Sequence, residues 1–271
     1  MKGIFVTGTD TGAGKTIVGV ALGLYLKQKG VPVKVVKPFE TGCLRLKEQL
    51  IPQDGALYRL LLQIEEPLDK IVPFRYSQPL APYQTSLIDK RPLNYGKALA
   101  ELRHDLGGDS FHLLEGAGGI MVPLEENIFI VDLIADLQVP VLVVAPNRLG
   151  TINHTLLTLA ALAARGIKNA GVILNEQDAS TDQVKMINRE YFQNVLGEGY
   201  LGEFPFLPGA RRLVEDMPGF ITEGSAPEEE ELVALREELA RSFAEMIKTD
   251  RLLSLYRQWI NGVLPSPEPQ W

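Results

Sequence analysis

Residues 4–16 constrain the fold more than any other stretch of the chain. An apolar run at 4–6 leads into a loop with glycines at 8, 12 and 14, then Lys15 and Thr16, and an apolar-rich helical pattern follows. Glycines let successive backbone N–H groups turn toward phosphate oxygens, and the start of a helix adds the positive end of its dipole. The order of strand, glycine loop, Lys-Thr and helix therefore predicts a phosphate-binding loop.

One position of this loop departs from the strict phosphate-loop pattern. The strict pattern has Gly six positions before its Lys, and here that position is Thr9, so the loop reads Gly8-x5-Gly14-Lys15-Thr16. A glycine-rich turn without a ligand is the alternative, but the strand and the helix lie on the correct sides for a phosphate loop. We therefore predict nucleoside triphosphate binding, with Lys15 bridging the outer phosphates and the Thr16 hydroxyl ligating magnesium.

The composition limits the class of protein. The chain has 271 residues, 45% of them hydrophobic, which is enough for one large α/β domain or two small ones. Its single cysteine, Cys43, excludes an internal disulfide, and its three histidines are widely separated. A formal net charge of −7 without a basic stripe argues against a nucleic-acid partner. We find neither a signal peptide nor an apolar run near the roughly 20 residues that span a bilayer, so we expect a soluble, cytoplasmic protein with no membrane partner.

Apolar runs typical of buried strands alternate with helical patterns along most of the chain. Several runs are apolar throughout, as at 141–145, which suits strands covered on both faces of a parallel sheet. This pattern predicts an α/β fold, a doubly wound and mostly parallel sheet flanked by helices, with ligands at the carboxyl ends of the strands. The predicted strands are 2–7, 33–37, 111–115, 140–145, 170–174 and a weaker one near 200–204. The predicted helices are 15–29, 54–64, 93–106, 129–138, 151–165 and 181–196.

The C-terminal part differs in character, and we divide the chain into an α/β domain at 1–222 and a helical extension at 223–271. Apolar residues recur at helical spacing from 232 to 246, and a second apolar stretch covers 252–264. We expect these helices to brace the sheet edge or to extend a dimer contact. The last seven residues, 265–271, which include the proline-rich run 265–269, are expected to be loose.

Polar side chains stand where the predicted strands end. Lys37 could face a transferring phosphate, or it could be a surface lysine. Glu115 ends an apolar run and precedes glycines that permit close approach of a ligand, so it is a candidate magnesium ligand. Asp54 opens a helix, where an N-cap and a metal ligand cannot be told apart from sequence. The amide of Asn175 offers a donor and an acceptor to a purine edge.

These motifs occur together in the order typical of dethiobiotin synthetases, the ATP-dependent ligases of biotin synthesis, and the chain resembles that family from about residue 1 to 208. The family's phosphate loop has the same departure from the strict pattern at the position of Thr9. The phosphate loop alone is shared with relatives in the same superfamily. The full set of motifs is much more specific to this family. The matching stretches are 8–16, Lys37-Pro38-x-x-Thr41-Gly42, Asp54, 115–119, 149–154 and Leu174-Asn175.

The resemblance implies positions for the nucleotide, the metal and the substrates. Gly12 to Thr16 would cradle the phosphates, and Asn175 would read the adenine. The implied nucleotide-binding residues are Gly12, Ala13, Gly14, Lys15, Thr16, Ile17, Asp54, Glu115, Gly116, Ala117, Gly118, Asn175, Glu176, Pro205, Phe206 and Leu207. The implied Mg²⁺ ligands are Thr16, Asp54 and Glu115. The implied substrate-binding residues are Thr41 and, across a homodimer interface, Gly150, Thr151, Ile152 and Asn153, whose helix start suits a carboxylate.

The resemblance also implies a reaction. The substrates would be 7,8-diaminopelargonate, CO₂ or bicarbonate, and ATP, joined through a carbamate and a carbamic–phosphoric anhydride. Lys15 and Lys37 would be the catalytic residues and would flank the carbamate and the γ-phosphate. Such a transfer needs positioning and charge neutralisation. Two departures stand out, since Phe39 replaces a small aliphatic residue after Lys-Pro and residues 208–212 lack an acid that some members place near the ribose.

Three other kinds of protein remain open at this point. A dimeric ATPase switch has a similar loop but usually a second lysine early in it, and residues 7–13 contain none. An amidating synthetase would need a glutaminase domain with a nucleophilic cysteine, and the chain has only Cys43. A regulatory domain that lost the chemistry is disfavoured because Lys15, Lys37 and both acidic candidates are present together.

Overall fold

The computed structural model describes residues 2–108 and 110–260, and in them a six-stranded parallel sheet forms the centre of the molecule. Its strands are β1 (Gly3–Gly8), β2 (Val33–Val36), β7 (Phe111–Gly119), β10 (Val141–Pro146), β11 (Asn169–Asn175) and β12 (Tyr200–Phe204). Their order across the sheet is β12-β11-β10-β1-β7-β2, and every neighbouring pair is parallel. All six predicted strands are therefore confirmed, although β7 continues to Gly119 instead of ending at 115.

Within residues 2–108 and 110–260, three two-stranded sheets lie outside the central sheet. One is parallel and two are antiparallel hairpins. Their strands are β3 (Phe39–Glu40) with β6 (Phe74–Arg75), β4 (Leu44–Leu46) with β5 (Gln49–Ile51), and β8 (Pro123–Glu125) with β9 (Ile128–Phe129).

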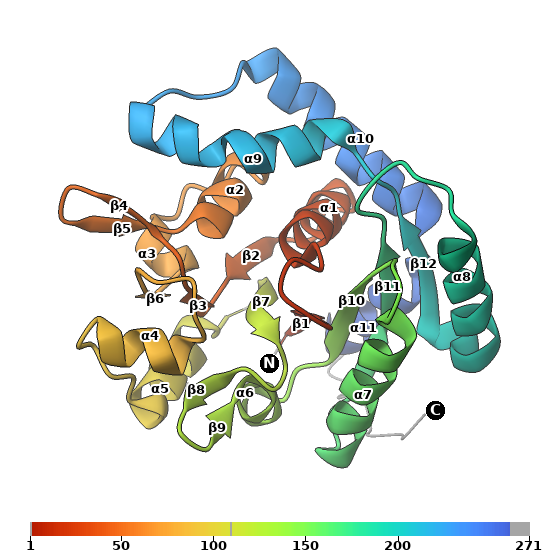
Figure 1. Cartoon of the computed structure of the whole chain (residues 1–271), viewed down its shortest axis with the longest axis horizontal. Coiled ribbons are helices and arrows are strands. Elements are labelled where there is room, and N and C mark those ends of the chain that lie inside the picture. The colour runs from red at the N-terminus through yellow and green to blue at the C-terminus, as the bar shows by residue number, and fades with distance from the viewer. Residues whose placement is uncertain (1, 109, 261–271) are drawn as a thin grey trace.

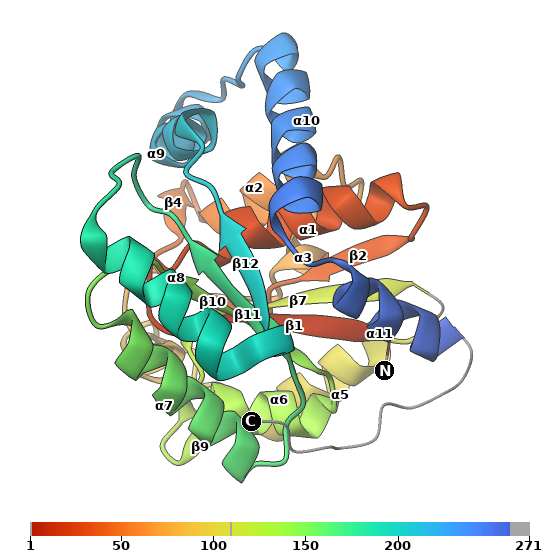
Figure 2. The same cartoon turned by 90° about the vertical axis from the view of Figure 1, so that its right-hand side faces the viewer.

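Helices cover both faces of the central sheet (Figures 1 and 2). One set packs in a first hydrophobic core: α1 (Lys15–Gln28), α2 (Gln53–Leu61), α3 (Leu68–Ile71), α9 (Pro208–Glu223), α10 (Glu229–Met246) and α11 (Asp250–Ile260). The other set packs in a second core: α5 (Tyr95–Asp105), α6 (Ile130–Leu137), α7 (Thr151–Ala164) and α8 (Gln183–Leu196). The short helices α4 (Pro82–Ile88) and η1 (Gly197–Gly199) complete the described chain.

The alternation of side chains along the strands explains the two cores. Ile4 and Val6 of β1 point into the first core, whereas Phe5 between them points into the second. Successive residues of a strand face opposite sides of a sheet, so a strand buried on both faces must be apolar at every position. The run at 141–145 has the same property and is buried throughout. The predicted doubly wound α/β fold is confirmed.

The C-terminal helices share the first core with the phosphate-loop helix. Phe243 of α10 is fully buried, and its ring centroid lies 5.7 Å from that of Tyr25 and 6.4 Å from that of Phe204. The Tyr25 hydroxyl donates to Oγ1 of Thr249 at 3.0 Å, and the ring of Tyr256 meets Phe111 at 5.9 Å. Hence residues 229–258 pack directly on α1 and on strands of the central sheet.

One helix of this region was not predicted from the sequence, and one predicted segment falls outside the described residues. The pattern did not predict α9, which begins at Pro208 and contains Pro218 in its interior. The apolar stretch 252–264 lies partly, and the proline-rich tail wholly, within 261–271, outside the described residues.

Within the part of the chain that is described, no helix is both long and apolar enough to cross a membrane.

Candidate functional site

A cavity of about 590 Å³ opens where the central strands end at their carboxyl termini. The phosphate loop follows β1, Lys37 follows β2, Glu115 lies within β7, and Asn175 ends β11. The carboxyl ends of parallel strands meet at one edge of a sheet, which is where ligands of doubly wound folds bind. The fold therefore brings these sequence-distant polar residues into one cavity.

Most residues that the sequence predicted for the site line this cavity. They are Gly12, Gly14, Lys15, Thr16, Ile17, Lys37, Thr41, Asp54, Glu115, Ala117, Gly118, Asn175, Glu176, Pro205, Phe206 and Leu207. Ala13 and Gly116 are buried behind its wall. Gly150, Thr151, Ile152 and Asn153 lie at the start of α7 and do not line it.

The phosphate loop is tied to the end of β11. Gly14 begins α1 with φ of 91°, in the left-handed region that favours glycine. A Cβ at this position would lie 2.1 Å from Nδ2 of Asn175, so no larger residue fits. The same Nδ2 donates to the carbonyl oxygen of Ala13 at 3.0 Å. The side chain predicted to read a base thus also holds the loop in place.

A compact cluster of charges lies beside the loop. The Lys37 ammonium contacts Oε1 of Glu115 at 2.6 Å and pairs with Oδ2 of Asp54, and the Thr16 hydroxyl donates to the same Oε1 at 3.0 Å. Burial disfavours the charged form of Lys37. The negative charges of Asp54 and Glu115 together have the larger effect and raise the pKa of the ammonium above its ordinary value. Lys15 differs, because burial and the nearby Lys37 lower its pKa.

Glu40 is a member of the site that sequence reasoning missed. It is buried, lines the cavity, and accepts hydrogen bonds from the backbone N–H groups of Asp54 at 2.9 Å and Gly55 at 3.1 Å. Burial, together with repulsion from Asp54, raises the pKa of this carboxyl to about 8. Through these two accepted hydrogen bonds the Glu40 carboxyl group caps the first turn of α2 and fixes the backbone of Asp54. Its position inside the Lys37–Gly42 motif was the available signal.

Tyr58 is a second missed member. Its fully buried hydroxyl donates to Oε2 of Glu115 at 2.7 Å, so both carboxylate oxygens of Glu115 are engaged. A Cβ on Gly19 of α1 would lie 2.0 Å from this hydroxyl, which explains the glycine there. Tyr58 follows Asp54 by four residues on a helix, and that spacing places two side chains on one face. The spacing could have identified it.

The oxygen donors of the cluster fit magnesium. Thr16, Asp54 and Glu115 supply one hydroxyl and two carboxylates around the Lys37 ammonium. Mg²⁺ prefers oxygen ligands and is usually held by one or two carboxylates together with substrate phosphates. Among the described residues no group of three or more His, Cys, Asp or Glu side chains is arranged to hold a metal by itself. The donor set therefore suits a metal ion that arrives with a nucleotide.

The start of α7 presents a different kind of surface. Thr151 is buried, and its Oγ1 has no hydrogen-bond partner among the described residues. Leu149, just before the helix, is 84% exposed. Arg148 reaches back to the phosphate loop, where its Nη2 lies 3.3 Å from Oδ2 of Asp10. Of the predicted carboxylate-binding residues, Gly150 and Asn153 are thus exposed and Thr151 is buried, and none of them lines the cavity of its own chain.

The parallel sheet, the phosphate loop and the Lys-Thr pair at the start of α1 define a P-loop nucleotide-binding protein. Residues 2–212 match the family described as "AAA domain". The chain is similar to the septum site-determining protein MinD complexed with Mg-ADP from Pyrococcus horikoshii, with a TM-score of 0.50 and 16% identity over 88% of this chain and 95% of that one. At this identity the likeness shows the fold alone.

Curated relatives are much closer in sequence. The "ATP-dependent dethiobiotin synthetase BioD" of Thermodesulfovibrio yellowstonii is 37% identical over 213 residues, which cover 76% of this chain and 89% of the relative. The protein of the same name from Bacillus licheniformis is 36% identical over 210 residues, covering 78% of this chain and 88% of that relative. The chain belongs to the dethiobiotin synthetase family, as its motifs indicated.

Proposed function

We propose that this chain is an ATP- and magnesium-dependent cyclo-ligase that forms the ureido ring of dethiobiotin from 7,8-diaminopelargonate and CO₂. The observation that carries the proposal is the Lys37 ammonium, fixed between Asp54 and Glu115 in the same cavity as the phosphate-loop lysine. Membership of the dethiobiotin synthetase family supports the same reaction. An ATPase switch shares the fold, but the relatives with 36–37% identity reported above are dethiobiotin synthetases.

The proposed reaction has three steps. One amine of the diamine adds to CO₂ and loses a proton, giving a carbamate. A carbamate oxygen attacks the γ-phosphorus of ATP, ADP leaves, and a carbamic–phosphoric anhydride forms. The second amine attacks the carbamoyl carbon, loses a proton and expels inorganic phosphate, which closes the ring. One ATP is consumed for each ring formed.

The residues of this chain act by position and charge. Negative charge builds on the oxygens around the transferring phosphorus, and fixed cations lower the energy of that arrangement. We assign this role to Lys15 and Lys37, both of which line the cavity. Asp54 and Glu115 hold Lys37 in place, while Glu40 accepts from the backbone N–H of Asp54 and Tyr58 donates to the Glu115 carboxylate. When bound, Mg²⁺ would be held by Thr16, Asp54 and Glu115 and would neutralise phosphate charge.

The two ends of the cavity suit the two substrates. Thr41, Lys37 and residues 79–82, which lead into α4, line the cavity, and we assign this part of it to the diamine. Asn175, Glu176 and 205–207 form the other end, which we assign to the adenine. We further propose a cytoplasmic homodimer in which Gly150–Asn153 of each chain binds the substrate carboxylate in the site of the other. The exposure of Gly150 and Asn153, outside the cavity of their own chain, supports this arrangement.

Phosphate release from Mg-ATP tests the function directly. It should be measured with and without 7,8-diaminopelargonate and bicarbonate, and the product followed by mass. We expect release that depends on both additions and a product with the mass of dethiobiotin. Release that ignores the diamine would contradict the proposal and favour an ATPase that acts on protein partners.

A further inference from the structure

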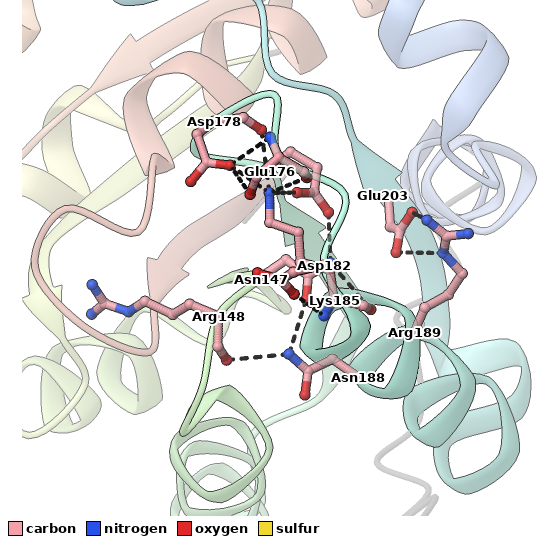
Figure 3. A network of polar contacts seen from close by, with 10 residues as sticks. Asn147, Arg148, Glu176, Asp178, Asp182, Lys185, Asn188, Arg189 and Glu203 are labelled. Carbon is pink, nitrogen blue, oxygen red and sulfur yellow. Dashed lines mark hydrogen bonds and ion pairs between the residues drawn. The ribbon is translucent and has the colours of Figure 1, made fainter.

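A polar network lies behind the nucleotide end of the cavity, and Lys185 stands at its centre (Figure 3). Lys185 is in the first turn of α8 and is only 6% exposed. Its ammonium lies 2.8 Å from Oε2 of Glu176 and 2.8 Å from Oδ1 of Asp178. It also donates to the carbonyl oxygens of Asp178 at 3.2 Å and Ser180 at 2.9 Å. One side chain therefore fixes the whole segment 176–180.

The same segment forms part of the cavity wall. Glu176 and Gln177 line the cavity, and Gln177 Nε2 donates to the carbonyl oxygen of Gly12 at 2.5 Å. Asn175, just before the segment, donates to the carbonyl oxygen of Ala13. The segment is thus held between Lys185 on one side and the phosphate loop on the other. A shift of the segment would move both the cavity wall and its contacts to that loop.

Two buried asparagines complete the support of Glu176. Asn147 Nδ2 donates to Oε1 of Glu176 at 2.6 Å, so Asn147 and Lys185 engage the two carboxylate oxygens separately. Asn188, one turn after Lys185, donates to Oδ1 of Asn147 at 3.0 Å and to the carbonyl oxygen of Arg148 at 3.2 Å. Because both carboxylate oxygens are hydrogen-bonded and Asn188 in turn holds Asn147, the Glu176 carboxylate has one defined position.

The charge balance makes Lys185 hard to replace. Burial disfavours the ammonium, but its hydrogen bonds to Asp178 and Glu176 raise the pKa of Lys185 above its ordinary value. The side chain of Glu176 is 16% exposed, so without the ammonium a largely buried carboxylate would lose its cation. Removing one partner of a buried ion pair is strongly unfavourable, and the remaining charge is expected to move toward water.

We propose that Lys185 is a positioning residue for the nucleotide, which holds segment 176–180 so that Glu176 and Gln177 keep their places in the cavity wall. The inference rests on the proposed function only in assuming that Mg-ATP binds in this cavity. Lys185 itself does not line the cavity and acts through the segment.

The test compares Lys185→Met with Arg189→Met in the full-length chain. Arg189 lies one turn further along α8 and pairs with Glu203 through contacts of 2.6 and 2.5 Å, away from the cavity. Calorimetric titration with Mg-ATP, well below the melting temperatures of all variants, gives the Kd. We expect Lys185→Met to raise the Kd about tenfold, in the range of mutations that act through a supporting network. Arg189→Met should leave the Kd unchanged.

A second variant, together with separate measurement of KM and kcat, distinguishes a positioning role from a purely structural one. Asp178→Asn removes one partner of Lys185 at an exposed position and should raise the Kd in the same direction by a smaller factor. In turnover assays the KM for ATP should rise with Lys185→Met, while kcat at saturating ATP should change less than about twofold. A lower melting temperature with an unchanged Kd for Mg-ATP would overturn the inference.

The wild-type chain distinguishes this inference from the proposed function. If it binds Mg-ATP but makes no dethiobiotin, the proposed function is wrong, and the weaker binding of Lys185→Met would still support the positioning role. If the wild-type chain binds no Mg-ATP, both are overturned.

Discussion

At the scale of single residues, the site is a set of paired charges whose supports come from different elements. Lys37 lies between two carboxylates, and each carboxylate has its own support, Glu40 through the backbone of Asp54 and Tyr58 through Glu115. A cation fixed in this way needs little rearrangement when charge develops on a phosphate. Such preorganised groups usually give the largest electrostatic contribution to catalysis.

Lys37→Met should therefore separate catalysis from binding. We expect diamine-dependent phosphate release to fall by roughly two to three orders of magnitude, as for loss of one preorganised donor. The Kd for Mg-ATP should change little, because Lys15 and the phosphate loop remain. Lys70→Met is a matched control, since Lys70 is exposed and pairs with the exposed Asp105. Equal losses in turnover and in ATP binding would make Lys37 a simple nucleotide anchor.

His112 gives a residue-scale prediction about pH. It is buried in β7, and burial lowers the pKa of its imidazole below the ordinary value of about 6.5. As pH falls through the unfolded-state pKa, the unfolded chain binds a proton that the folded chain does not. The contribution of His112 to stability is thus fully present above that pKa and is lost as pH falls toward the folded-state pKa.

Urea unfolding at pH 7.5 and 5.5 tests this sign. From pH 7.5 to pH 5.5 the free energy of unfolding of the wild-type chain should fall relative to that of His112→Gln, because the contributions of groups present in both chains, Glu40 among them, cancel in this comparison. His104→Gln is the control, because the side chain of His104 is 90% exposed. A pH difference that is the same in all three chains would contradict the assignment.

At the scale of elements, the strands and helices with a periodic apolar pattern could be predicted from the sequence. Features that depend on tertiary contacts could not. The six central strands and the helices that cross between them follow from runs of buried apolar residues. Helix α9 was missed because Pro218 lies in its interior and its apolar residues are few. The capping of α2 by Glu40 could not be predicted, since it joins a strand residue to a helix start more than ten residues later. Only the tertiary structure brings them together.

Residues 223–260 are best explained, in our proposal, as a brace for the α/β body, and Phe243 of α10 tests this. Its ring packs against Tyr25 of α1 and Phe204 of β12 in the first core. Phe243→Ala should lower the free energy of unfolding by about 3–5 kcal/mol, as for other large-to-small core substitutions. Met246→Ala, on the same helix but 51% exposed, should change it by less than about 0.5 kcal/mol.

Urea titration of both variants measures the difference. If Phe243→Ala unfolds at the same midpoint as Met246→Ala, α10 contributes little to the stability of the body and the brace is wrong. A separate early transition would show instead that the extension unfolds by itself.

At the scale of the whole molecule, the proposed homodimer matters because four of the five predicted substrate-binding residues, Gly150, Thr151, Ile152 and Asn153, do not line the cavity. Leu149, just before α7, is 84% exposed, and Leu157 on the helix is 61% exposed. A contiguous exposed apolar patch is typical of an interaction surface, and these leucines are the candidates for one here. If two chains meet through α7, Leu157→Glu would place a carboxylate in an apolar interface at a high desolvation cost. The dimer dissociation constant should then rise by at least about tenfold.

Sedimentation velocity over a range of concentrations measures that constant. Val233→Glu is the matched control, because Val233 is a 44% exposed apolar residue on α10, far along the chain from α7. Weaker dimerisation of Leu157→Glu should be accompanied by a higher KM for the diamine and a nearly unchanged Kd for Mg-ATP, since the nucleotide cavity lies within one chain. A wild-type chain that stays monomeric would rule out the shared site, and equal effects of the two substitutions would move the interface away from α7.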